Sequence, residues 1–202
     1  MRIASNVAWA FSSCLVLSTL VLAPVALAHP GHDTTTGLSA GFLHPFTGLD
    51  HLMAMLAVGI LAGQRGGRAI YTIPASFIGA MMFGAYLGLH SVHAMAGVEQ
   101  AIMASVLVLG VCVALATSAP YSALLVLPAL FAAFHGFAHM TEIRAGQSPL
   151  VYGLGFVAAT ALLHLGGIGL GVLFRRFASL KLGHFAGAAI AACGILLFAH
   201  VL

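Results

Sequence analysis

Apolar residues fill long stretches of this chain, and polar residues are confined to short breaks between them. A membrane-spanning helix needs about 20 predominantly apolar residues. Six stretches meet that requirement: residues 42–62, 69–89, 98–116, 121–141, 150–174 and 183–201. No connection is long enough for a soluble domain. The pattern therefore predicts an all-α fold, a polytopic membrane bundle of six transmembrane helices in one domain over residues 40–202.

A further apolar run at the N-terminus has a different character. Residues 1–28 contain Arg2, an apolar centre and a terminal Ala26-Leu27-Ala28, the pattern of a signal peptide with its cleavage site. We expect this segment to be cleaved; an uncleaved seventh helix is the alternative. Residues 29–39 are polar and predict an exposed periplasmic tail that carries His29 and His32.

Composition and charge agree with a membrane protein and set its orientation. The chain is 61% hydrophobic and 5% charged, whereas soluble proteins carry about 25% charged residues. Five of the six basic residues of the connections gather on one side, and only Arg144 lies on the other; the five are Arg65, Arg68, Arg175, Arg176 and Lys181. Because basic residues favour the cytoplasmic side, we expect a bacterial inner-membrane protein with both mature termini in the periplasm. The small basic excess gives no indication of nucleic-acid binding.

Helix order and glycine spacing add two expectations about packing. Three spans in each direction permit an inverted repeat of two three-helix halves, although the two halves show no convincing sequence similarity. Glycines four residues apart let helix backbones approach closely in lipid. Such pairs are Gly84 and Gly88, Gly167 and Gly171, and Gly183 and Gly187.

Ionisable residues inside membrane spans are costly and indicate function. The first span begins with His44 and continues to Asp50 and His51. On an ideal helix the two histidines share a face and Asp50 points aside. Pro45 and Gly48 make an ideal helix doubtful here, so the local geometry can also bring all three together.

The fourth span carries a second group, His135, His139 and Glu142, which share one stripe of a helix. Imidazole and carboxylate ligands suit zinc, nickel, cobalt or iron better than calcium or magnesium. The predicted topology places this group and the His44 group in the same, outer half of the membrane. Two elements of the bundle therefore converge on a predicted metal site.

Several other residues are weaker candidates for metal entry or relay. Glu99 begins the third span on the outer side, where the helix dipole alone also favours a carboxylate. His90 and His93 end the second span there, as either an entry rim or wet loop residues. His164 is the deeper histidine of the fifth span, with a relay or a structural hydrogen bond equally expected. His29 and His32 in the tail are candidates for initial capture. We expect no resident cofactor.

At these motifs the sequence resembles the HupE/UreJ family of nickel permeases. The likeness rests on the H-x5-D-H pattern from His44 to His51 and on the Phe134-His135-Gly136, Ala138-His139 and Glu142 pattern. It implies a secondary permease that carries nickel, or cobalt in some members, into the cytoplasm to supply hydrogenase or urease. By the same likeness, His44, Asp50, His51, Glu99, His135 and Glu142 match positions important for transport. Met140 is a departure, since many relatives have glycine there.

The same residues are also compatible with two other classes of protein. A His and carboxylate cluster can also activate water in an intramembrane metalloenzyme, and two histidines can hold a haem. No nucleotide-binding motif is present in the sequence, so ATP is not expected to drive transport from this chain alone. The bilayer and the metal ion (Ni²⁺, with Co²⁺ or Zn²⁺ as alternatives) are the expected partners. Assembly into a homo-oligomer is compatible with the sequence.

Overall fold

The computed structural model describes residues 37–91, 95–116, 118–141, 143, 147–177 and 180–199. Within these ranges the chain is helical and contains no strand, which confirms the predicted all-α class. The helices are α2 (Gly37–Thr47), α3 (Leu49–Arg65), α4 (Ala69–Leu89), α5 (Val98–Ala114), α6 (Tyr121–Thr141), α7 (Pro149–Arg176) and α8 (Leu180–Ala199). The predicted signal peptide and the histidines of the tail lie outside the described residues.

Four of the described helices, α4, α6, α7 and α8, are long and apolar enough to cross a membrane. The predicted first span differs from a single helix: α2 and α3 are bent by 83° at the break between them and together can form a fifth span. Helix α5 is apolar but has 17 residues, which gives a length of about 26 Å. The structure therefore supports a membrane protein. Helix α5, the third predicted span, is about 4 Å shorter than a hydrocarbon core of about 30 Å, so the count of six spans stays a prediction.

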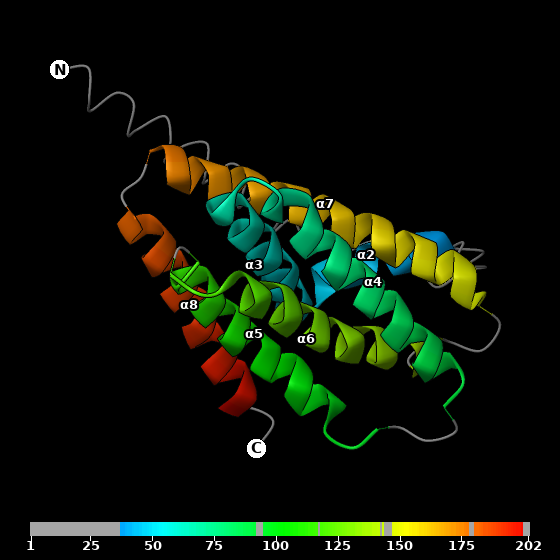
Figure 1. Ribbon diagram of the computed structural model, residues 1–202. Helices are drawn as coiled ribbons and strands as arrows, with labels where there is room; N and C mark the ends of the chain where they lie inside the picture. The colour runs from blue at the N-terminus through cyan, green and yellow to red at the C-terminus, as the bar shows by residue number, and fades with distance from the viewer. Residues whose placement is uncertain are drawn as a thin grey trace. The chain divides into compact units, whose positions relative to one another are not determined.

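The most extensive packing joins helices that are distant in sequence (Figure 1): α4 with α6, α3 with α7, and α5 with α8. A repeat of two three-helix halves would relate α3 to α6, α4 to α7 and α5 to α8. Under that exchange the α4–α6 pair becomes the α7–α3 pair, and the α5–α8 pair stays the same. The main pairings therefore have the pattern that an inverted repeat requires.

Glycines set the close approach of α3 and α7. A Cβ atom added to Gly59 would lie 2.3 Å from the backbone oxygen of His164, and one added to Gly167 would lie 2.4 Å from that of Leu56. Gly63 and Gly171 make equivalent contacts one turn further along. The sequence spacing therefore correctly indicated Gly167 and Gly171 as packing residues. Because Gly59, Gly63, Gly167 and Gly171 align in the same order, α3 and α7 run parallel.

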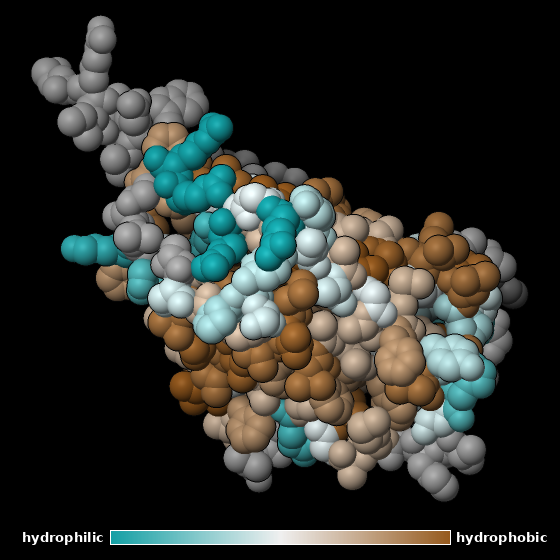
Figure 2. Space-filling model, viewed as in Figure 1, coloured by the Kyte–Doolittle hydropathy of each residue, from teal (hydrophilic) through white to brown (hydrophobic). Residues whose placement is uncertain are grey.

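Large apolar side chains cover the outside of the helices. Leu150 and Phe185 are more than 70% exposed, at 73% and 71%. Figure 2 shows apolar residues over the middle of the visible face and hydrophilic residues at two opposite ends. One end, here called the arginine end, is where α3 and α7 finish, at Arg65 and Arg176. The opposite end, where α3 and α7 begin, is called the histidine end. This distribution suits a protein whose middle faces hydrocarbon.

Neighbouring glycines of α7 provide a matched test of this packing. We expect Gly167→Ala to lower the thermal unfolding midpoint of the detergent-purified protein, because its Cβ meets the α3 backbone and overpacking costs about 1–3 kcal/mol. Gly166 has open space at the same position, so Gly166→Ala should leave the midpoint unchanged or raise it through better helix propensity. Equal effects of the two substitutions would contradict the α3–α7 contact.

Candidate metal centre

The break between α2 and α3 arises from residues that do not support a continuous helix. Pro45 lies in the last turns of α2 and has no N–H to donate. Gly48 has extended backbone angles, φ −100° and ψ 123°, and its carbonyl accepts the first hydrogen bond of α3 from Leu52 N. The Thr47 hydroxyl donates to His44 O at 2.7 Å and occupies a carbonyl at the end of α2. The chain therefore turns sharply after His44 and before His51.

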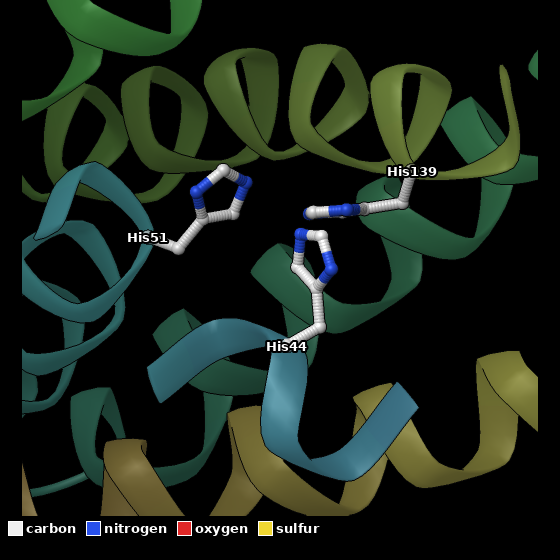
Figure 3. A group of neighbouring side chains, drawn as sticks. All are labelled: His44, His51 and His139. Carbon is white, nitrogen blue, oxygen red and sulfur yellow. The ribbon is translucent and has the colours of Figure 1, made fainter. Parts of the chain in front are cut away.

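This turn brings together three histidines from three helices (Figure 3): His44 of α2, His51 of α3 and His139 of α6. Each offers a ring nitrogen, and these three atoms all lie within 4.8 Å of one another. The ring centroids of His139 are 4.6 Å from His44 and 4.5 Å from His51. The two histidines of the first predicted span therefore meet through a bend, and not through the periodicity of one helix. We call this set the three-histidine group.

Asp50 lies behind His51 and orients it. Its Oδ1 accepts hydrogen bonds from His51 Nδ1 at 2.7 Å and from His51 N at 2.8 Å. A carboxylate can only accept, so Nδ1 carries the ring proton and Nε2 keeps its lone pair. His51 Nε2 is buried without a hydrogen-bond partner among the residues described. Asp50 itself lies outside the three-histidine group, and its hydrogen bond to Nδ1 leaves Nε2 as the His51 nitrogen that is available to a metal ion.

His135 lies beside the group and has a similar arrangement. Its ring centroid is 4.9 Å from that of His51, and its side chain is fully buried. Ser105 of α5 donates its hydroxyl proton to Ile102 O, so its oxygen accepts from His135 Nε2 at 3.0 Å. His135 Nδ1 then keeps a lone pair and has no partner in the described part of the chain. No sequence signal indicated Ser105, because a serine in an apolar helix has many other roles.

Aromatic rings close the side of the site formed by α7. The Phe156 ring centroid is 4.0 Å from His139 and 6.1 Å from His44, and the Tyr152 ring is 6.1 Å from His44. Both aromatic residues are buried. Next to them a mostly apolar cavity of about 300 Å³ is lined by His139, Met140 and Phe156 among others. Met140 therefore borders the same cavity as His139.

The remaining predicted residues lie elsewhere or outside the described ranges. Glu99 is exposed on the first turn of α5 and lines a separate cavity with Phe137 and Thr141, on another face of α6 from His135 and His139. His90 is exposed at the end of α4, and its Nδ1 is 2.8 Å from Tyr86 O. His164 is buried on α7, away from the group. Outside the described residues lie Glu142, His93, His29 and His32.

The arrangement can bind a divalent transition metal. Neutral imidazole nitrogens are ligands for zinc, nickel, cobalt and copper, whereas magnesium and calcium prefer oxygen. His139 adds two ring nitrogens that have no hydrogen-bond partner within the described ranges. Buried polar atoms are normally satisfied, so several lone pairs left together in an apolar bundle indicate a site for a cation.

Asp50→Asn tests the role of the carboxylate. Asparagine can rotate its amide to donate to Nδ1, which moves the proton of His51 to the atom needed for metal binding. We expect the affinity for Co²⁺ to fall about 10- to 100-fold, as for other supporting partners of metal-bound histidines. Titration of the purified protein followed by visible absorption measures it. Thr141→Val, which removes an exposed hydroxyl at the end of α6, is the control. Unchanged affinity in Asp50→Asn would contradict the assigned role.

Comparison with known proteins agrees with the family resemblance of the two histidine motifs. The family model described as HupE / UreJ protein matches residues 17–197. Protein HupE of Rhizobium leguminosarum bv. viciae is 38% identical over 178 residues, which cover 88% of this chain and 92% of that protein. No solved structure matches the chain significantly. The chain therefore belongs to the HupE/UreJ family, and this membership supports a membrane transporter of nickel or cobalt rather than an enzyme.

Proposed function

We propose that this chain is a secondary transporter that carries Ni²⁺ across the bacterial inner membrane into the cytoplasm, with the three-histidine group as its main binding site. The observation that carries the proposal is the convergence of His44, His51 and His139 within 4.8 Å. The three come from separate helices of a membrane bundle. A site between helices is suited to transport, because relative helix movements can open it to either side.

The expected orientation supports capture from outside. The positive-inside rule assigns the arginine end to the cytoplasm and the histidine end to the periplasm. In this orientation all six predicted spans cross the membrane, with α2 and α3 as a broken first span. Broken helices within membranes are tolerated where they line a binding site, which matches the place of Gly48 beside His51. Exposed His90, with His93 and the tail histidines His29 and His32, would supply the first, weaker contacts for the ion.

The ligand chemistry balances binding against release. Transport requires a site that strips part of the hydration shell and still lets the ion leave. The imidazoles of His44, His51 and His139 bring no negative charge, and Asp50 provides one carboxylate beside them. This set attracts a dication more weakly than a site with several carboxylates or thiolates would. His135 lies close enough to replace one of the three as the ion moves, which makes it a fourth participant.

The identity of the cargo rests on family membership more than on ligand type. Three imidazoles also suit Co²⁺ and Zn²⁺, so these ions are expected competitors. We infer nickel as the physiological cargo because the chain belongs to the HupE/UreJ family. A nickel enzyme such as a hydrogenase or urease would then be the indirect recipient. A homo-oligomer is compatible with the proposal but not required, since one chain supplies the whole three-histidine group.

Uptake of ⁶³Ni²⁺ into cells tests the proposal. We expect His44→Ala and His139→Ala each to lower the initial rate by at least about tenfold, because each removes one of three ligands from the site. The control is His184→Ala, which removes an exposed histidine of α8 outside the three-histidine group. This variant should transport at the wild-type rate. Wild-type uptake by both cluster variants, at equal membrane abundance, would rule out the assigned site.

The driving force can be tested separately. A divalent cation that moves into a negative interior gains about 4.6 kcal/mol per 100 mV, enough for about a thousandfold accumulation. We expect ⁶³Ni²⁺ accumulation in proteoliposomes to follow an imposed inside-negative potassium diffusion potential without a pH gradient. Accumulation that required a pH gradient and ignored the potential would instead indicate proton coupling.

A further inference from the structure

One further buried imidazole lies outside the three-histidine group and apart from His135. His164 of α7 is 1% exposed, and neither of its ring nitrogens has a hydrogen-bond partner among the residues that the structure describes. An apolar side chain of similar size would fill the same space without leaving polar atoms unsatisfied. The three-histidine group does not include His164, so the outer site does not account for a histidine at this buried position.

The surroundings of His164 contain two further donor atoms. Thr160 lies one helical turn earlier on α7; its hydroxyl donates its proton to Phe156 O at 2.9 Å, and its oxygen lies 3.4 Å from the sulfur of Met55. Thr160 and Met55 are both fully buried. Gly59, one turn beyond Met55 on α3, packs against the backbone of His164. The close α3–α7 contact therefore holds an imidazole, a hydroxyl and a thioether within neighbouring turns. Imidazole and thioether are ligands for the later transition metals and not for magnesium or calcium.

One aromatic ring is close both to His164 and to His135 beside the three-histidine group. The Phe77 ring centroid of α4 is 5.2 Å from His164 and 6.3 Å from His135. The Phe77 side chain is fully buried. The same ring therefore contacts both imidazoles, and its side chain adopts a small number of rotamers. Phe77 is thus adjacent to two sets of nitrogen donors.

His164 lies closer to the arginine end than the three-histidine group does, so an ion that enters at the histidine end would reach it later. Phe156, which contacts His139, lies eight residues before His164 on α7, a separation of about 12 Å along the helix axis. Met55 likewise follows His51 by one turn of α3. Both helices continue from there to the arginine end. His164 therefore lies on the side of the three-histidine group that faces the proposed cytoplasmic exit.

We propose that His164 forms an inner binding station for the transported divalent transition-metal ion, with Met55 and Thr160 as supporting donors, and that Phe77 separates it from the three-histidine group. The inference rests on the proposed function, because it assigns a second stop on the same route. Two stations of moderate affinity let an ion leave the first site without full rehydration. The unpartnered imidazole of His164 then binds a metal ion during each transport cycle.

Metal binding to the purified full-length protein provides the first test. We expect Co²⁺ titration, followed by visible absorption and by metal analysis, to reveal two bound ions per chain in the wild type. His164→Leu should lose one of them and keep the spectrum of the ion at the three-histidine group. His44→Ala should lose the other and keep the His164 component. His184→Leu, the matched loss of a histidine from α8, should bind two ions.

Transport and stability separate an inner station from a structural histidine. In proteoliposomes we expect His164→Leu to lower the initial ⁶³Ni²⁺ uptake rate at least about tenfold, and His164→Met, which keeps a donor atom, to recover part of it. Without metal, His164→Leu should unfold at the same temperature as the wild type or higher, because it removes unsatisfied polar atoms. A lower unfolding midpoint would identify His164 as a packing residue and overturn the proposal.

The outcomes also distinguish this inference from the proposed function. Normal Co²⁺ stoichiometry and normal uptake in His164→Leu, together with lost uptake in His44→Ala, would overturn the inner station and leave the outer site standing. Normal uptake in both variants would overturn the proposed function and the inner station with it. Loss of one Co²⁺ and slow uptake in His164→Leu, with His184→Leu unchanged, supports the station.

Discussion

The break at Gly48 is the constraint on which the candidate site depends. A continuous helix from His44 to His51 would place Asp50 aside from both histidines. The 83° bend between α2 and α3 instead directs His44 back toward His51 and His139. It also places Asp50 on the first turn of a new helix, where a carboxylate is favoured by the helix dipole. The break therefore sets the positions of the candidate ligands His44 and His51 and of the carboxylate that orients His51.

The bundle around this break holds the histidines in fixed protonation patterns. Asp50 accepts a hydrogen bond from His51 Nδ1, and Ser105 accepts one from His135 Nε2, so the opposite ring nitrogens keep their lone pairs. Gly136, between His135 and the residues that follow it, packs directly on the α4 backbone at Met81. The glycine of the histidine motif therefore serves helix contact, while its neighbours serve the site. Packing and chemistry share one short segment of α6.

The sequence predicted the helical segments and most of the group, but not how its members meet. The spacing of His135 and His139 placed both on one stripe of α6, and the structure agrees, because that helix is regular. The meeting of His44 with His51 depended on a bend whose angle no periodicity encodes. Asp50 was expected among the ligands, and in the structure it is hydrogen-bonded to His51 and lies outside the three-histidine group. Ser105 had no sequence signal. Among the described residues His164 has no hydrogen-bond partner, and this depends on packing between α3, α4 and α7 that emerges only in three dimensions.

The central claim is that His44, His51 and His139 together bind the transported ion. X-ray absorption spectroscopy of Ni²⁺ bound to the purified protein tests it most directly, because imidazole rings give a characteristic multiple-scattering signal. The account predicts several imidazoles around nickel in the wild type and fewer in His139→Ala. A nickel environment of water and carboxylate oxygens, unchanged by that substitution, would contradict it.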